Sequence, residues 1–133
     1  MFTNTQDYYW VFNNALSPDT CDKIIELGLS KKTVLARTHE YDKDKFKNLN
    51  KTQKINLKKI RNSEVAFLDD KWLMDILNDF VVKANMNSGW KYQIDYSERI
   101  QFTKYKKNQH YNFHCDSSIQ DICKYGKIRK LSL

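Results

Sequence analysis

The sequence predicts an α+β fold, because a segment with helical periodicity is followed by segments with strand alternation. Apolar residues recur at three- and four-residue intervals across 71–86, which is the spacing of one face of a helix. Aromatic or β-branched residues then alternate with polar ones across 90–96 and 99–105, predicting two antiparallel strands joined near Ser97 and Glu98. Helices followed by a run of strands favour a single α+β or mainly-β domain. With 133 residues, 41% apolar and 14% aromatic, the chain can build a core.

The first predicted helix begins after an aromatic segment. Residues 8–16 are aromatic and β-branched, and they predict an edge strand or an extended arm that leads into this helix. Ser17 can cap the helix with its side chain, and Pro18 suits the first helical position. Gly28 is a suitable stop. The apolar face of this helix is predicted to comprise Cys21, Ile24, Ile25 and Leu27.

The stretch from 31 to 62 has few apolar residues and no sustained period, which predicts a long polar loop. Much of the lysine excess lies here, and a solvated face is the preferred interpretation over a substrate-contacting surface. A short apolar strand is predicted at 65–68, after which Asp69 or Asp70 can cap the helix over 71–86. Trp72 and Phe80 in that helix are interpreted as core residues and not as part of a cofactor site.

Composition excludes several classes of protein. The three cysteines are widely spaced and form no C-x-x-C pair, so we expect a reducing compartment, the cytoplasm. No apolar stretch approaches the length of a membrane span, and we expect no membrane partner. Only three Gly are present and no glycine-rich phosphate loop, which disfavours nucleotide-binding enzymes. The net charge of +7 is compatible with a polyanionic partner.

The segment FHCDS contains a candidate metal site. On a strand, His114 and Asp116 would project to the same side, and Cys115 to the other side as a small buried residue. An imidazole and a carboxylate are two members of the two-histidine, one-carboxylate triad that binds Fe(II). The alternative is a buried His114 paired with Asp116 or with a backbone carbonyl. His110 is interpreted as a surface histidine or as one that supports a ligand.

The run RIQFTKYKKNQHYNFHCDSS around this segment resembles the iron-binding core of the 2-oxoglutarate dioxygenases related to prolyl 4-hydroxylase. In that family a strand ending in Tyr is followed by a tight turn containing Gln, an aromatic residue and His-x-Asp. The matching positions are Tyr105, Gln109, Tyr111, His114 and Asp116. The resemblance implies that His114 and Asp116 bind Fe(II), and that the Tyr105 hydroxyl donates a hydrogen bond to a carboxylate of 2-oxoglutarate. The alternative for Tyr105 is a core strand residue.

The resemblance also implies a fold in which amino-terminal helices pack on a double-stranded β-helix, or jelly roll. The family's second iron histidine, and the cation that pairs with the distal carboxylate of 2-oxoglutarate, follow the first motif after further strands. No His follows Asp116, so we expect residues 1–133 to be a single, truncated dioxygenase domain with an incomplete jelly roll. Residues 127–133 are expected to begin the next strand. The turn departs from the family, which carries Gly where this chain has 106–108 as Lys-Lys-Asn.

The expected activity is hydroxylation of a C–H bond with release of succinate and CO2. Fe(II) would be the cofactor, 2-oxoglutarate the co-substrate and ascorbate a candidate reductant. The first expected substrate is a prolyl residue of a peptide or protein, with a small molecule as the alternative, and this interpretation requires no nucleic acid. Two other hypotheses stand beside it: a basic nucleic-acid-binding module built on the Lys-rich stretch with Tyr41 and Phe46, and a catalytically incomplete remnant of a dioxygenase.

Overall fold

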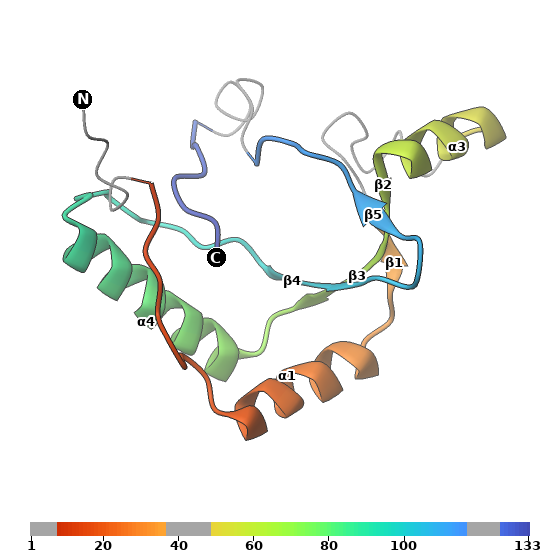
Figure 1. Cartoon of the computed structure of the whole chain (residues 1–133). Coiled ribbons are helices and arrows are strands. Elements are labelled where there is room, and N and C mark those ends of the chain that lie inside the picture. Colours follow the sequence, from red (N-terminus) through yellow and green to blue (C-terminus); the bar gives the residue numbers. More distant parts are fainter. Residues whose placement is uncertain (1–7, 37–48, 117–125) are drawn as a thin grey trace. The chain divides into compact units, whose positions relative to one another are not determined.

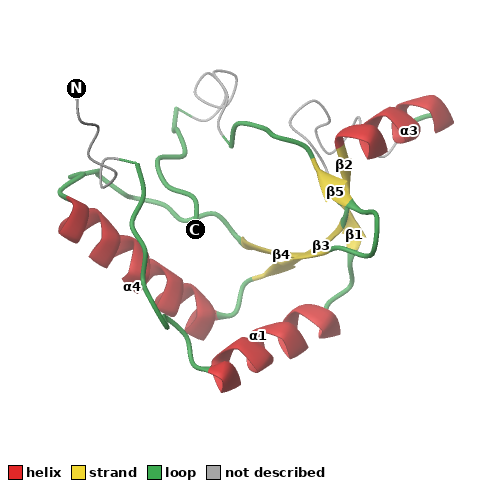
Figure 2. Ribbon diagram, viewed as in Figure 1, coloured by secondary structure: helices red, strands yellow, loops and turns green. Residues whose placement is uncertain are grey.

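A computed structural model describes residues 8–36, 49–116 and 126–133, and shows the mixed helix and sheet content of the α+β class predicted from the sequence (Figure 1). The elements are α1 (Pro18–Ser30), β1 (Val34–Leu35), α3 (Lys51–Ile60), β2 (Arg61–Asn62), β3 (Glu64–Leu68), α4 (Lys71–Ser88), β4 (Ile100–Lys104) and β5 (His110–Tyr111). The described strands are short and form a three-stranded and a two-stranded sheet (Figure 2). The described residues do not form a jelly roll, which stays a prediction.

The chain divides into two compact units. Unit 1 comprises Met1–Ile25, Asp69–Ile100 and Cys115–Leu133, and unit 2 comprises Glu26–Leu68 and Gln101–His114. Unit 2 therefore contains both sheets, apart from the first residue of β4, and unit 1 contains α4. The expectation of one domain over 1–133 stays a prediction. None of the helices in the described part of the chain is both long enough and apolar enough to cross a membrane.

Helix α1 begins where the sequence predicts. Pro18 is its first residue, and the Thr20 amide donates a hydrogen bond to Ser17 Oγ at 3.2 Å, which is the expected side-chain cap. The predicted apolar face is wrong in part, because Cys21 is exposed and Ile25 keeps 47% of its surface exposed. The preceding residues 8–16 form no strand, so the edge-strand alternative is wrong, and they are an arm that contains a turn at Asn13 and Asn14.

Gly28 does not stop α1, and the prediction that it does is wrong. The helix continues to Ser30, and Gly28 is buried inside it. A Cβ atom at Gly28 would lie 2.4 Å from ring carbons of Phe102 on β4, which is closer than any real contact. The glycine is therefore required for the close approach of an aromatic ring to the helix backbone.

The three-stranded sheet of unit 2 has β3 at its centre, between β1 and β4. Strands β1 and β3 are antiparallel, with Val34 opposite Val65. Val65 and the next residue, Ala66, are 3% and 1% exposed, and consecutive strand residues point to opposite faces. Both faces of β3 are therefore covered, and the predicted strand at 65–68 is confirmed with Glu64 added.

Helix α3 lies in the stretch that the sequence predicts to be a polar loop, so that prediction is wrong for residues 51–60. The helix begins with a capping box, in which Asn50 Oδ1 accepts from the Gln53 amide and Gln53 Oε1 accepts from the Asn50 amide, both at 2.9 Å. Leu57 on the same helix is fully buried. One buried leucine and a capping box thus define a helix that has no regular apolar period. Tyr41 and Phe46 lie outside the described residues.

Helix α4 confirms the most periodic segment of the sequence. Asp70 occupies the N-cap position without a side-chain cap bond, and Gly89 ends the helix in the left-handed conformation at φ 75°. Phe80 is half-buried, with its ring centroid 5.0 Å from that of Phe12 in the arm. Trp72 is 40% exposed, which corrects its interpretation as a core residue.

Residues 90–96 do not form the predicted strand. The Asn85 side chain accepts from the Tyr92 amide at 3.0 Å and donates to the Tyr92 carbonyl at 2.9 Å. These are the backbone groups that a strand would pair with a neighbour, so the alternation of 90–96 does not lead to a hairpin. Only the second predicted strand exists, as β4, and its partner is β3. The strand expected at 127–133 is also not formed.

Candidate functional site

The segment that resembles an iron-binding core begins at the end of β4. Tyr105 follows this strand directly, and a tight turn comes next, in which Gln109 Oε1 accepts from the Lys106 amide at 2.7 Å and the Gln109 amide donates to the Lys106 carbonyl at 3.0 Å. Asn108 takes the positive φ of 67° that glycine takes most easily. Tyr105 is 48% exposed, so its alternative interpretation as a core residue is wrong.

The turn leads into β5, which is joined to the end of α3. Strand β5 pairs with β2 in the antiparallel sense, with Tyr111 opposite Arg61 (Figure 1). The Asn112 amide donates to the Ile60 carbonyl at 3.0 Å, and His110 Nε2 lies 3.1 Å from the Lys59 carbonyl. A carbonyl can only accept, so His110 donates this bond. His110 is exposed and anchors β5 to the helix end, which agrees with its interpretation as a surface histidine.

His114 lies in a loop, because β5 ends at Tyr111 and residues 112–116 contain no strand. The alternation argument that placed His114 and Asp116 on a shared face is therefore wrong. The imidazole stacks on Tyr111 with centroids 3.6 Å apart and planes 14° apart, and its Nδ1 lies 2.8 Å from the Asn112 carbonyl. The ring is exposed, so the buried alternative is wrong, although the backbone carbonyl partner is present.

The hydrogen bond of His114 fixes its tautomer. Because the Asn112 carbonyl accepts, Nδ1 carries the proton in the neutral ring and Nε2 carries the lone pair. Metal-binding histidines commonly donate their other ring N–H to a carbonyl or carboxylate in this way. The donor chemistry of His114 thus fits an Fe(II) ligand.

Arg61 and Ser63 extend the Tyr111–His114 stack into the interior of unit 2. The Arg61 guanidinium carbon lies 4.3 Å from the Tyr111 ring centroid, and its Nε donates to Ser63 Oγ at 3.2 Å. Arg61 is 6% exposed and Ser63 is fully buried. Sequence reasoning missed both residues. Their two-residue spacing, directly before the predicted strand at 65–68, is the signal that places them on one side of an extended chain.

Asp116 belongs to unit 1, whereas His114 belongs to unit 2. The Ser132 hydroxyl donates to Asp116 Oδ2, and Arg129 Nη1 lies 3.8 Å from Oδ1. The same guanidinium donates to both carboxylate oxygens of Glu98, at 3.2 and 2.6 Å. A metal ion would therefore share the Asp116 carboxylate with these donors. Cys115 is exposed, which corrects its interpretation as a small buried residue.

The described part of the chain contains no cluster of metal-binding side chains. Among residues 8–36, 49–116 and 126–133, no group of three His, Cys, Asp or Glu side chains is gathered to hold a metal ion. His39 lies outside the described residues. The side chains of His114 and Asp116 are each of a type that binds Fe(II).

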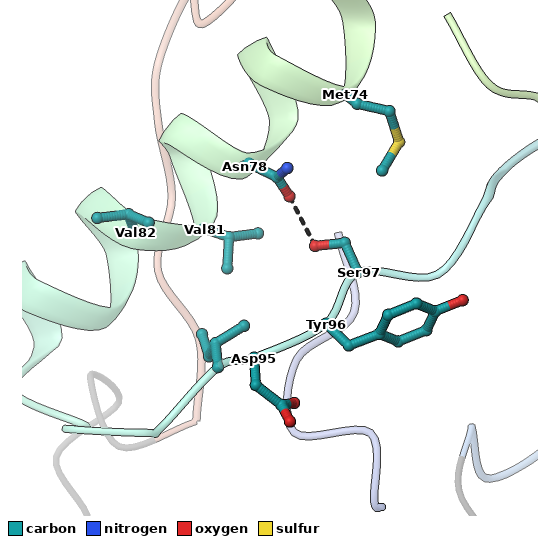
Figure 3. Close-up of a pocket in the computed structure, with 8 residues that line it drawn as sticks. Met74, Asn78, Val81, Val82, Asp95, Tyr96 and Ser97 are labelled. Atoms are coloured by element: carbon teal, nitrogen blue, oxygen red, sulfur yellow. Dashed lines mark hydrogen bonds between the residues drawn. The ribbon is translucent and has the colours of Figure 1, made fainter. Parts of the chain in front are cut away.

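Unit 1 contains a separate pocket of about 390 Å³ (Figure 3). Asn78 and Ser97 point toward one another across it, and Ser97 Oγ donates to Asn78 Oδ1 at 2.6 Å. Asp95 also lines it, and the hydrogen bond from Lys127, together with the attraction of its charge, lowers the pKa of this carboxyl below the ordinary value. The lining includes no His or Cys, so the pocket is not suited to the predicted metal chemistry.

The fold and the site together define an α+β protein with a His-x-Asp segment that follows a strand, a tight turn and a short second strand. No family model matches this chain, and no curated protein and no solved structure matches it. The functional conclusion therefore rests on the residues themselves.

Proposed function

We propose that this chain provides two iron ligands, His114 and Asp116, of an Fe(II) and 2-oxoglutarate dependent dioxygenase of the prolyl-4-hydroxylase-like kind. The observation that carries the proposal is the hydrogen bond from His114 Nδ1 to the Asn112 carbonyl, because metal-binding histidines commonly donate their other ring N–H to a carbonyl in this way. The order of β4, Tyr105, a turn closed by Gln109, β5 and His114 supports it. The jelly-roll core is part of this proposal.

The proposed reaction converts a C–H bond, 2-oxoglutarate and O2 into an alcohol, succinate and CO2. One oxygen atom of O2 enters the alcohol and the other enters succinate. The chemistry that bound Fe(II) supplies is the activation of O2, with ascorbate as the reductant that keeps the metal ferrous. His114 Nε2 and an Asp116 oxygen would hold the metal, and the exposed Tyr105 hydroxyl would donate to a carboxylate of 2-oxoglutarate. A prolyl residue of a peptide or protein is the proposed substrate.

Spectroscopy and turnover of the purified protein test this proposal. Anaerobic Fe(II) and 2-oxoglutarate should produce a weak visible charge-transfer band, and air with ascorbate should then yield succinate. His114→Ala and Asp116→Ala should each lower succinate formation by more than about 100-fold, since loss of residues that only support a ligand costs about 10- to 100-fold. Tyr105→Phe should raise the KM for 2-oxoglutarate.

His110→Ala is the matched control, because His110 is an exposed histidine four residues away that anchors β5 to Lys59. This variant should keep the charge-transfer band. A protein that shows no band and no succinate, or a His114→Ala variant that behaves like His110→Ala, would exclude the proposed site. Proline-containing peptides added to the turnover assay should stimulate succinate formation if the substrate is a prolyl residue.

A further inference from the structure

The positive charge of the chain is concentrated in unit 2. Its described residues include ten Lys or Arg and two Glu, whereas those of unit 1 include eight Lys or Arg and nine Asp or Glu. One of the two glutamates among the described residues of unit 2, Glu64, lies in an ion pair with Lys106 at 3.5 Å. The bias toward lysine is therefore a property of one unit and not of the whole composition.

Helix α3 presents part of this charge as a stripe. Lys51, Lys54 and Lys58 are all exposed, and at 100° per residue they fall within a sector of about 60°. The helix contains no acidic residue, and like charges at these spacings destabilise a helix by a few tenths of a kcal/mol per pair. The fully buried Leu57 points about 90° away from the centre of this stripe. The stripe is therefore exposed to solvent. A bound anion would reduce the repulsion between its lysines and so stabilise the helix.

Exposed aromatic rings adjoin the end of the same helix. The Asn112 side chain and amide donate to the Lys59 and Ile60 carbonyls at 3.2 and 3.0 Å, which fixes the loop after β5 to the end of α3. The next residue, Phe113, is fully exposed, and the Tyr111–His114 stack borders it in sequence. Exposed planar rings beside lysines are the combination that binds unpaired bases, because every base can stack on an aromatic face.

We propose that unit 2 binds single-stranded nucleic acid, with the lysine stripe of α3 contacting phosphates and Phe113 stacking on a base. An acidic peptide would use the lysines but has no need of an exposed phenylalanine. The surface excludes both proposed iron ligands, and this binding does not depend on the dioxygenase activity. It also differs from a module built on Tyr41 and Phe46, since its residues come from α3 and the loop after β5.

Fluorescence anisotropy with the full chain tests the binding, in the absence of iron and 2-oxoglutarate. The probe is a labelled oligouridylate of about 12 nucleotides, within the usual range of single-strand sites. The triple variant K51Q/K54Q/K58Q should reduce the slope of log K against log salt by about 2, because each phosphate contact on a single strand contributes about 0.7. Phe113→Ala should weaken binding about tenfold at unchanged slope, as expected for loss of one stacked base.

The matched control is K23Q/K71Q/K83Q, which removes the same charge from exposed positions of unit 1. It should leave the affinity within about twofold, which separates local contacts from the effect of net charge. K51R/K54R/K58R should bind normally, which guards against a glutamine variant that fails to fold. Equal losses in the stripe and control variants would overturn the proposal. So would competition by polyglutamate as strong as that of unlabelled oligouridylate, or undiminished binding by Phe113→Ala.

Discussion

At Gly28 the absence of a side chain allows the Phe102 ring to lie against the backbone of α1. At Arg61 a cation under Tyr111 supports the ring on which His114 stacks. Each contact joins residues that are far apart in the sequence. A single substitution at either place therefore acts on packing that local propensity does not describe.

Gly28→Ala should destabilise the protein by about 1–3 kcal/mol, the usual cost of forcing extra volume into a packed interior. A loss of stability would be informative, because replacing glycine by alanine inside a helix normally stabilises the protein by about 1 kcal/mol. The free energy of unfolding in urea measures it. Leu29→Ala, at the 54% exposed neighbouring position, should change stability by less than about 0.5 kcal/mol. A Gly28→Ala variant as stable as wild type would contradict the contact with Phe102.

Tyr111→Leu should release the His114 ring from its stack. The Cε1 proton resonance of His114 should move downfield, because the ring current of Tyr111 no longer shields it, and an aromatic pair worth about 0.5–1.5 kcal/mol is lost. If His114 binds iron, the affinity for Fe(II) should fall about tenfold, the lower range for residues that orient a ligand. Tyr96→Leu, at an exposed tyrosine of unit 1, is the control, and an unchanged His114 resonance in Tyr111→Leu would contradict the stack.

At the scale of elements, α3 shows how a helix can form without a regular apolar face. Its like-charged stripe opposes helix formation, and the capping box and the buried Leu57 favour it. Its last carbonyls accept from His110 and Asn112, so the helix end and the candidate site are joined. A substitution that destabilises α3 should therefore also destabilise β5.

Asn50→Ala should lower the free energy of unfolding by about 1 kcal/mol, since it removes the side-chain acceptor of the capping box. Faster amide exchange in α3 and in β5 should accompany the loss. Asn56→Ala replaces an exposed asparagine inside the same helix and should be neutral or slightly stabilising, because alanine has the higher helix propensity. Equal effects of the two substitutions would rule out a role for the cap.

At the scale of the whole molecule, ion pairs within unit 1 join the last described segment to residues 95–98. Lys127 contacts Asp95 at 2.8 Å and Arg129 contacts Glu98 at 2.6 Å. No backbone hydrogen bond joins residues 126–133 to a strand among the described residues, so the amide exchange of this segment should respond to charge. All these side chains are at least partly exposed, and each pair alone contributes little.

The contact between Asp95 and Lys127 should weaken in acid. The hydrogen bond from Lys127 and its charge lower the pKa of Asp95 in the folded protein. The stabilisation is therefore present above the unfolded pKa, about 4, and is lost as the pH falls through the lower folded value. Amide exchange of residues 126–133 should be faster in Asp95→Asn than in wild type at neutral pH, and the two should converge in strong acid. Asp22→Asn on α1 should show no such difference. If the exchange rates of Asp95→Asn and wild type differed more in acid than at neutral pH, the contact would be contradicted.

The sequence by itself determined the features that depend on neighbouring residues. The start of α1 at Ser17 and Pro18, the strand at 65–68 and the long helix α4 follow from capping chemistry and periodicity, which act within a few residues. The His-x-Asp segment and the turn containing Gln109 were equally visible, as residues in order. The iron site assigned to them stays a prediction.

Only the tertiary structure decided which patterns became elements. Alternation at 90–96 did not give a strand, because Asn85 bonds the backbone of Tyr92. Gly28 does not end its helix, because the ring of Phe102 occupies the space of a side chain. His114 and Asp116 lie beyond the end of β5, and their neighbours Tyr111, Arg129 and Ser132 were set by the fold. These outcomes depend on particular side-chain contacts, which the periodicity of the sequence does not specify.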